Sequence, residues 1–239
     1  MPRSLGRATM TDKSWENSIQ ELIDLVAKPN WKEADKHGEI VGRLYNACFE
    51  VWLAARRQAT KSITITSIMY MTIFKELHWA FISVMSGAHL TAVRTFRFVF
   101  EYAVQSSILE EKYRDLPDSD DKIDIALEDP ESKHFNWNMI DRLKFLDDAE
   151  IASSKELYHR LSEFVHPQSK MLKTVTPGSL VSFDLDPGLL ELCARLAVDV
   201  SDVLAVVLLH EYTALKHESE LKEIVEELGL KMTRIRIER

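Results

Sequence analysis

The stretch from His89 to Tyr113 constrains the fold more than any other part of the chain. It contains neither Gly nor Pro, and its apolar residues lie nearly all the way round a helix. Because such a helix is buried on most of its sides, the segment predicts a central helix of an all-α protein. The residues that define it are Leu90, Val93, Phe96, Phe98, Val99, Phe100, Tyr102, Val104, Ile108 and Leu109.

The remainder of the chain is also rich in helical patterns. Only 7 Gly and 7 Pro occur in 239 residues, and so few helix breakers favour long helices over many short strands. We therefore expect a multi-helix up-and-down bundle of long helices, with an acidic connector and short accessory helices. Helices are predicted at 15–27, 31–59, 62–85, 89–113, 123–127, 139–146, 153–166 and 189–215, within a single domain at 11–230 that follows a disordered leader at 1–10.

Local signals refine these boundaries. The run 62–66 alternates like a strand, but helical patterns on both sides assign it to a helix or its frayed start. Ser153-Ser154-Lys155-Glu156 matches a capping box, and Asp186 with Pro187 predicts the cap and first position of the last long helix. In the helix at 31–59 the expected apolar face comprises Ile40, Leu44, Ala47, Cys48, Val51 and Leu53.

Three segments fall outside this helical pattern. Residues 110–150 hold 14 acidic and 6 basic residues, which is typical of a solvated surface connector. Residues 168–186 form a long loop. The segment 231–239 alternates Met or Ile with Arg and predicts either a basic tail or an added edge strand.

Composition limits the classes of function. A net charge of −8 argues against a general nucleic-acid coating protein, although a local cationic site remains open. The only cysteines, Cys48 and Cys193, lie in apolar helical stretches and predict buried, reduced thiols in a cytoplasmic protein.

Lys75, Glu76 and His78 lie within the apolar segment 62–85, so we expect a core helix there and no membrane span. No phosphate-binding loop, dinucleotide fingerprint or nucleophile elbow occurs, and no cofactor is expected.

One polar stripe interrupts the apolar helix at 89–113. Arg94, Arg97, Glu101 and Gln105 follow one another at steps of 3, 4 and 4 residues, which puts them on one helical face. Their apolar surroundings predict partial burial, and Arg97 can pair with Glu101. The pair fits two roles: a structural ion pair that fixes the helix, or part of an anion-binding stripe.

The segment Tyr158–Pro167 carries a second set of candidate residues. Pro167 disfavours helical geometry at His166, so the helix is expected to end there. The helix dipole stabilises a cationic histidine at that position, which suits acid–base chemistry, and Arg160 could hold a phosphate oxygen. The structural alternative is a capping histidine with a surface arginine.

A metal site at the same helix end is a third interpretation. His159, Glu163 and His166 share a helical face and could ligate a metal ion. The spacing is not that of an HExxH motif and no fourth ligand is evident, so the expected site contains no metal.

The Arg160-x5-His166 element resembles the Arg-x(4–6)-His motif of the HEPN superfamily. The phrase from Leu161 to Pro167 is similar to uncharacterised prokaryotic HEPN-like proteins that end a helix in LS-x-aromatic-V-H-P, and Arg97-x3-Glu101 fits their upstream Arg-x3-Glu. The resemblance spans roughly residues 40–215. Leu161 stands where the family often has a polar residue after the motif arginine.

This resemblance implies an α-helical bundle that often dimerises and brings two Arg/His sets to a symmetric cleft. Active members are metal-independent endoribonucleases of toxin–antitoxin or antiphage systems, so RNA and an antitoxin-like protein are the implied partners. In this chain Arg160 and His166 are then the expected catalytic residues, supported by Arg97, Glu101, Tyr158 and Ser162. Other members are non-catalytic nucleotide-binding or interaction modules, which is the alternative for this chain.

Overall fold

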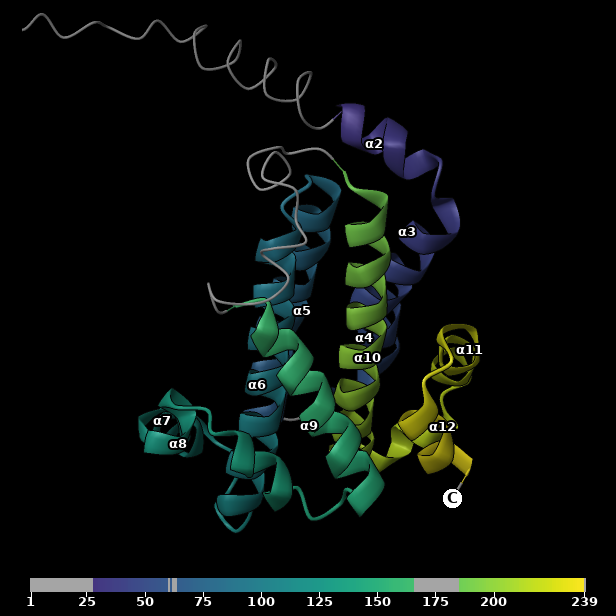
Figure 1. The fold of residues 1–239 in the computed structure, drawn as a ribbon. Helices are drawn as coiled ribbons and strands as arrows, with labels where there is room; N and C mark the ends of the chain where they lie inside the picture. The colour runs from purple at the N-terminus through teal and green to yellow at the C-terminus, as the bar shows by residue number, and fades with distance from the viewer. Residues whose placement is uncertain (1–27, 60, 62–63, 166–184, 239) are drawn as a thin grey trace, which may run out of the picture.

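A computed structural model describes residues 28–59, 61, 64–165 and 185–238. All the regular structure in these residues is helical, so the expected all-α class is confirmed. The helices form one packed assembly around a shared core (Figure 1). None of the described helices combines the length and the apolar character that crossing a membrane requires.

Five rods alternate in direction and form the bundle (Figure 1). The first, third and fifth run downward in this view, and the second and fourth run upward, as an up-and-down bundle requires. In chain order they are the continuous rod α3 (Gly38–Tyr45), η2 (Asn46–Glu50) and α4 (Val51–Ala59), then α5 (Ile65–Met85), α6 (His89–Lys112), α9 (Asp148–Glu163) and α10 (Pro187–Glu211).

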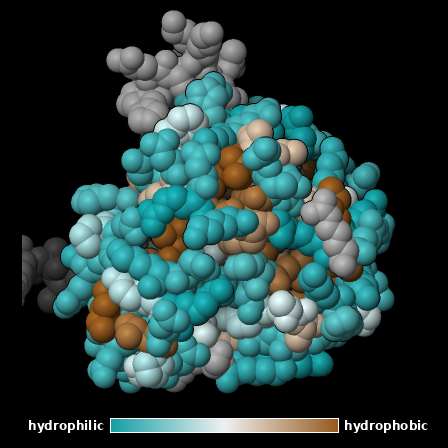
Figure 2. Space-filling model, turned by 90° about the horizontal axis from the view of Figure 1, so that it is seen from below, coloured by the Kyte–Doolittle hydropathy of each residue, from teal (hydrophilic) through white to brown (hydrophobic). Residues whose placement is uncertain are grey.

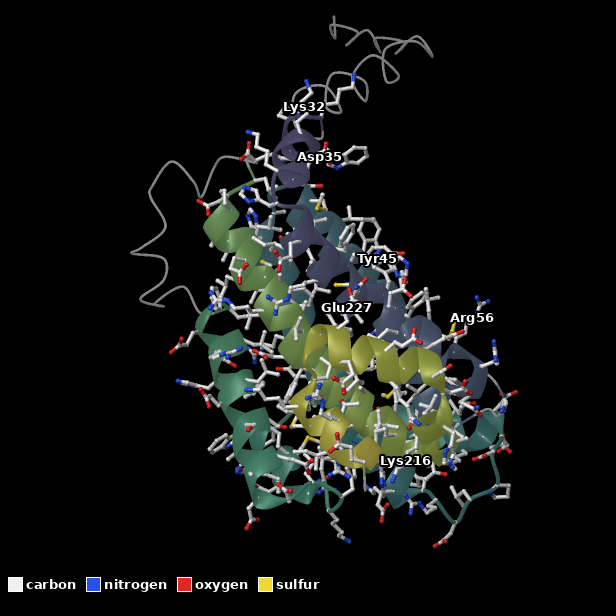
Figure 3. The ribbon with its side chains drawn as sticks, turned by 90° about the vertical axis from the view of Figure 1, so that its right-hand side faces the viewer. Lys32, Asp35, Tyr45, Arg56, Lys216 and Glu227 are labelled. Carbon is white, nitrogen blue, oxygen red and sulfur yellow. The ribbon has the colours of Figure 1, made fainter. Side chains whose placement is uncertain are left out.

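Shorter elements surround these rods. They are α2 (Lys28–Asp35), α7 (Asp120–Glu128), α8 (Pro130–Lys133), the 3-10 helices η3 (Trp137–Arg142) and η5 (Thr213–His217), α11 (Ser219–Leu228) and α12 (Lys231–Glu238). Figure 3 shows α11 lying along the outer side of the α3–α4 rod, with Glu227 at the end nearer Tyr45. Two hydrogen bonds to α11 and its N-terminal flank hold it there, from Asn46 Nδ2 to Glu227 at 2.7 Å and from Gln58 Nε2 to Glu218 at 3.1 Å.

Helices α6 and α10 form the centre of the core, as their apolar patterns predict. Phe96 and Phe100 of α6 are fully buried, and α10 is buried on nearly all sides from Cys193 to Leu209. Each such aromatic or aliphatic side chain contributes about 1.5–3 kcal/mol through removal of apolar surface from water. Both cysteines are buried and unpaired, as expected.

The single helix predicted at 31–59 is wrong in two respects. The backbone leaves helical geometry at His37 (φ −118°, ψ 36°), which separates α2 from α3. Further on, the five residues of η2 form a π-helical turn, which takes an extra residue and rotates the following side chains. Ala47, Cys48 and Val51 are buried as expected, whereas Leu53 is exposed, because it lies two residues beyond Val51 and thus about 200° round the regular helix α4.

The predicted start of α9 is also wrong. The helix begins at Asp148, and Asp147 caps it by accepting a hydrogen bond from the Glu150 backbone while the Glu150 side chain accepts one from the Asp147 backbone. This Asp-x-x-Glu pattern lies six residues before the serine pattern, and it sets the start of the helix because it adds more than a turn to it. Ser154 is instead buried within α9.

Other boundaries follow the sequence more closely. Thr64 caps α5, so the alternating run belongs to a helix start, and the helix at 139–146 is a 3-10 turn at 137–142. Asp186 caps α10 with Pro187 at the first position, as predicted.

The edge strand considered at 231–239 is wrong, because Lys231–Glu238 form helix α12. The predicted helix at 15–27 and the loop at 168–184 lie outside the described residues.

The acidic connector is anchored to α6 by buried ion pairs, in contrast to the expected solvated excursion. Lys122 of α7 donates to Glu110 at 2.6 Å and to Asp118 at 2.9 Å, and its side chain is only 2% exposed. The second oxygen of Glu110 accepts from the backbone of Ile65 at the start of α5. Further along, Asp129 accepts hydrogen bonds from Lys112 and Tyr113, which lower the pKa of its carboxyl to about 2.

Candidate functional site

The Arg-x3-Glu motif of α6 meets α9 at Tyr158. Arg97 Nε donates to Glu101 Oε1 at 2.7 Å, and Arg97 Nη2 donates to the Tyr158 hydroxyl at 3.0 Å. The guanidinium carbon also lies 5.2 Å from the centroid of the Tyr158 ring, within the range of a cation–π contact. Arg97 therefore contacts α9 two residues before Arg160, the first residue of the Arg-x5-His element.

Aromatic packing fixes the position of Tyr158. Its ring lies 6.0 Å from that of Phe100, a buried residue of α6, and 5.0 Å from that of Phe135. The hydroxyl therefore projects from a packed aromatic cluster toward Arg97. Ser162, one turn further along α9, uses its hydroxyl to donate to the Tyr158 backbone oxygen at 2.8 Å.

The Arg97–Glu101 pair is partly buried, as predicted. Each side chain is 21% exposed. Burial alone disfavours the charged guanidinium, but the hydrogen bond and charge of Glu101 outweigh it and raise the pKa of Arg97. Arg97 is thus a fixed, fully charged group at the junction of α6 and α9.

The other two members of the polar stripe differ in their surroundings. Arg94 is exposed one turn before Arg97 and makes no ion pair within the described part of the chain. Gln105 is buried and donates to the backbone oxygen of Glu131, which fastens α8 to α6. The stripe is one helical face, but only its middle faces α9.

Arg160 points to a different neighbour. It lies two residues beyond Tyr158, a step of about 200° around a helix, and pairs with Asp199 of α10. The Arg160 side chain is 42% exposed and lines a pocket of about 210 Å³ together with Ser153 and Lys231. The structure therefore places Arg160 and Arg97 on different sides of α9.

His166 and Pro167 lie outside the described residues. The last described residues of this segment are Phe164 and Val165, which follow the end of α9. His159 and Glu163 lie 3.5 Å apart and are both well exposed. Among the described residues no three His, Cys, Asp or Glu side chains are grouped to hold a metal ion. The alternative metal set of His159, Glu163 and His166 extends beyond the described residues.

Sequence reasoning missed Asp199, the partner of Arg160. It also missed His210 and Glu211 at the end of α10, where two titratable residues close an otherwise apolar helix. That abrupt change from apolar to titratable residues is a signal the sequence does contain. The Asp199 pairing has no such signal, because its partner is 39 residues away.

Comparisons with known proteins returned no relative. No family model, no curated protein and no solved structure matches the chain.

Proposed function

We propose that this protein is a metal-independent endoribonuclease of the HEPN type. One observation carries the proposal: Arg97 of the Arg-x3-Glu motif donates to Tyr158, eight residues before His166 on the segment that carries the Arg-x5-His motif. Tyr158 lies two residues before Arg160, so this hydrogen bond supports the proposal by holding α6 against the helix that leads into the Arg-x5-His motif.

In the proposed reaction His166 acts as general acid or base on the RNA 2′-hydroxyl or the leaving 5′-oxygen. Arg160 stabilises the charge that develops on the phosphate, using guanidinium donors that Asp199 leaves free. Arg97 and Glu101 are positioning residues, because they hold α9 through Tyr158. Asp199 keeps Arg160 oriented and competes with phosphate for it.

Cleavage of mixed single-stranded RNA in the presence of EDTA tests this proposal. We expect the wild-type protein to cleave, His166→Ala to abolish cleavage, and Arg160→Ala to reduce the rate by about 10²-fold or more, the usual loss of a charge-stabilising donor. Arg195→Ala is the matched control, since Arg195 is an exposed arginine on α10. Equal, undetectable cleavage by wild type and His166→Ala across several RNAs would refute the ribonuclease assignment.

A non-catalytic interaction module is the second candidate. The mutual pairing of Arg97 with Glu101 and of Arg160 with Asp199 favours it, because paired charges are also what a structural role requires. Thermal melting separates the two candidates. A His166→Ala variant that melts like wild type fits a catalytic histidine, whereas a clear loss of stability fits a helix cap.

We also propose that the protein forms a homodimer through the outer face of α5. Ile68, Met71, Trp79 and Ile82 are all exposed there, and they lie at −7, −4, +4 and +7 relative to Lys75. Because this spacing is symmetric, two antiparallel copies would match Ile68 with Ile82 and Met71 with Trp79, as a two-fold interface requires. At the centre of this interface, Glu76 would offset the positive charge of Lys75.

Light scattering at micromolar concentration tests the dimer. We expect twice the chain mass for wild type and the chain mass for Trp79→Lys. Trp137→Lys is the control, since Trp137 is equally exposed but belongs to η3. A monomeric wild-type protein would contradict the proposal.

A further inference from the structure

A large cavity opens at the end of the bundle remote from α2. It is about 660 Å³ and lies where the end of α6, the end of α10 and the segment that includes η3 converge. Pockets for small molecules occupy roughly 300–1,000 Å³ and favour such junctions between elements. Figure 2 looks onto this end of the molecule and shows apolar surface enclosed by hydrophilic atoms.

The cavity has an apolar and aromatic part. Ile108, Leu143 and Phe145 line it together with His210. The Phe145 and His210 rings stack, with centroids 4.1 Å apart and planes 15° apart. Stacked flat rings beside aliphatic side chains form a surface suited to a planar or apolar group.

Positive charge dominates the polar part. The lining contains four cations, Lys112, Arg114, Arg142 and Lys144, against the two carboxylates of Glu111 and Asp141. Such an excess is unusual in a chain of net charge −8. The ends of α6 and α10 add partial negative charge of only about half a unit each. Asp129 and Glu131, which are not part of the lining, already pair with Lys112 and Arg142, so the positive charge open to an anion is that of Arg114 and Lys144.

Two of these cations are available to a ligand. Lys144 is exposed and forms no ion pair within the residues that the structure describes. Arg114 pairs with Glu111 at 2.7 Å, but both side chains are about half exposed, so the pair is worth only about 0–1 kcal/mol. A phosphate that accepts two hydrogen bonds from one guanidinium would replace this carboxylate readily.

Two titratable groups lie at this end of α10. Glu211 is largely buried beside the cavity but does not line it; its Oε1 lies 3.9 Å from His210 Nε2 and has no hydrogen-bond partner among the described residues. Burial, with the nearby Glu110, raises the pKa of this carboxyl to about 7. His210, which does line the cavity, is affected in the opposite direction, since burial and the charge of Arg114 lower its pKa. Displaced pKa values are common at binding sites, and His210 carries one within the cavity lining.

We propose that this cavity binds a small phosphate ester, with the phosphate held by Arg114 and Lys144 and a planar or apolar body packed against Phe145 and His210. The lining begins on α6 at Ser107, six residues beyond Glu101 and ten beyond Arg97, and it shares no residue with the pocket at Arg160. It is therefore independent of the proposed ribonuclease site.

Isothermal titration with adenosine monophosphate, adenosine and inorganic phosphate tests the proposal. We expect the monophosphate to bind with a dissociation constant below about 1 mM, and both fragments to bind at least tenfold more weakly, since each offers only half of the contacts. Lys144→Ala and Arg114→Ala should each weaken binding about tenfold or more. Lys222→Ala is the matched control, because Lys222 is exposed on α11, away from the cavity lining, and it should bind as wild type does.

Three outcomes would overturn the proposal: no binding of the monophosphate at millimolar concentration, binding unaffected by either substitution, or phosphate binding as tightly as the ester. Both substitutions are at surface positions, and circular dichroism confirms that the variants fold. RNA cleavage by Lys144→Ala should equal that of wild type, which keeps a failure here distinct from a failure of the ribonuclease proposal.

Discussion

Arg97 and Tyr158 are 61 residues apart in the chain, yet the guanidinium of one donates to the hydroxyl of the other at 3.0 Å. This hydrogen bond joins the middle of α6 to the antiparallel helix α9. Because Arg97 is also held by Glu101, its guanidinium bridges a carboxylate on its own helix and a phenol on α9.

The link between α6 and α9 can be measured by a double-mutant cycle. We expect Tyr158→Phe to lower the free energy of unfolding by about 0.5–1.5 kcal/mol, since it removes one hydrogen bond and keeps the ring contacts. Arg97→Ala should cost about 2–4 kcal/mol, because Glu101 loses its partner in a half-buried position. In urea melts the double mutant should lose roughly 1 kcal/mol less than the sum of the two single losses. Full additivity would show that the two groups do not interact.

The buried ion pair of the connector is expected to matter for stability. Lys122→Met should lower the free energy of unfolding by about 3–5 kcal/mol, because it leaves the Glu110 carboxylate buried without its countercharge. Lys133→Met, an exposed lysine of the same connector, should change it by less than about 0.5 kcal/mol. Denaturant melts of both variants check this. A silent Lys122→Met would mean that α7 does not dock on α6 in solution.

The docking of α12 depends on one carboxylate of α10. Asp202 accepts hydrogen bonds from the backbone of Met232 at 3.0 Å and from the backbone and hydroxyl of Thr233 at 2.9 and 2.7 Å. We expect Asp202→Ala to release α12, which hydrogen exchange would report as loss of protection at 231–238, with a stability loss of about 2–4 kcal/mol. Asp199→Ala is the control on the same helix, and protection unchanged in Asp202→Ala would contradict this docking.

The carboxyl of Glu211 makes stability depend on pH in a defined direction. Its pKa is about 7 in the folded chain against an ordinary value of 4.5, so between these values the folded state retains a proton that the unfolded state has lost. Its contribution to stability is therefore full below pH 4.5 and falls as the pH rises toward 7. Each pKa unit is worth about 1.4 kcal/mol, so the shift of about 2.5 units gives a penalty of about 3–4 kcal/mol above pH 7.

Glu211→Gln should remove this penalty. We expect the variant to melt roughly 5–10 °C above wild type at pH 8.5 and to approach it at pH 4.5. Glu223→Gln, at an exposed position of α11, should show no such divergence. Melting curves of the three proteins at both pH values check the prediction. If the difference in melting temperature between wild type and Glu211→Gln is the same at pH 8.5 and pH 4.5, the prediction is wrong.

Local interactions were predictable because they depend only on helical spacing. The Arg97–Glu101 pair follows from an interval of four residues, and the Asp186 cap follows from its position before Pro187. The start of α9 was not predicted correctly, because two capping patterns lie six residues apart and only the packing of the added turns decides between them. The π-helical turn at 46–50 has no sequence signature of its own and could not be foreseen, whereas the exposure of Leu53 could, since it lies about 200° from buried Val51 on the same helix.

The sequence by itself determined that this protein is a bundle of long helices, which faces of α6 and α10 are apolar, and which polar residues share a helical face. The tertiary structure alone decided which residues meet across the helices: Arg97 with Tyr158, Arg160 with Asp199, and Lys122 with Glu110. The physical reason is that periodicity fixes the direction of a side chain relative to its own helix, whereas contacts between helices depend on how each helix is rotated and placed. That placement is set by the packing of the whole core at once.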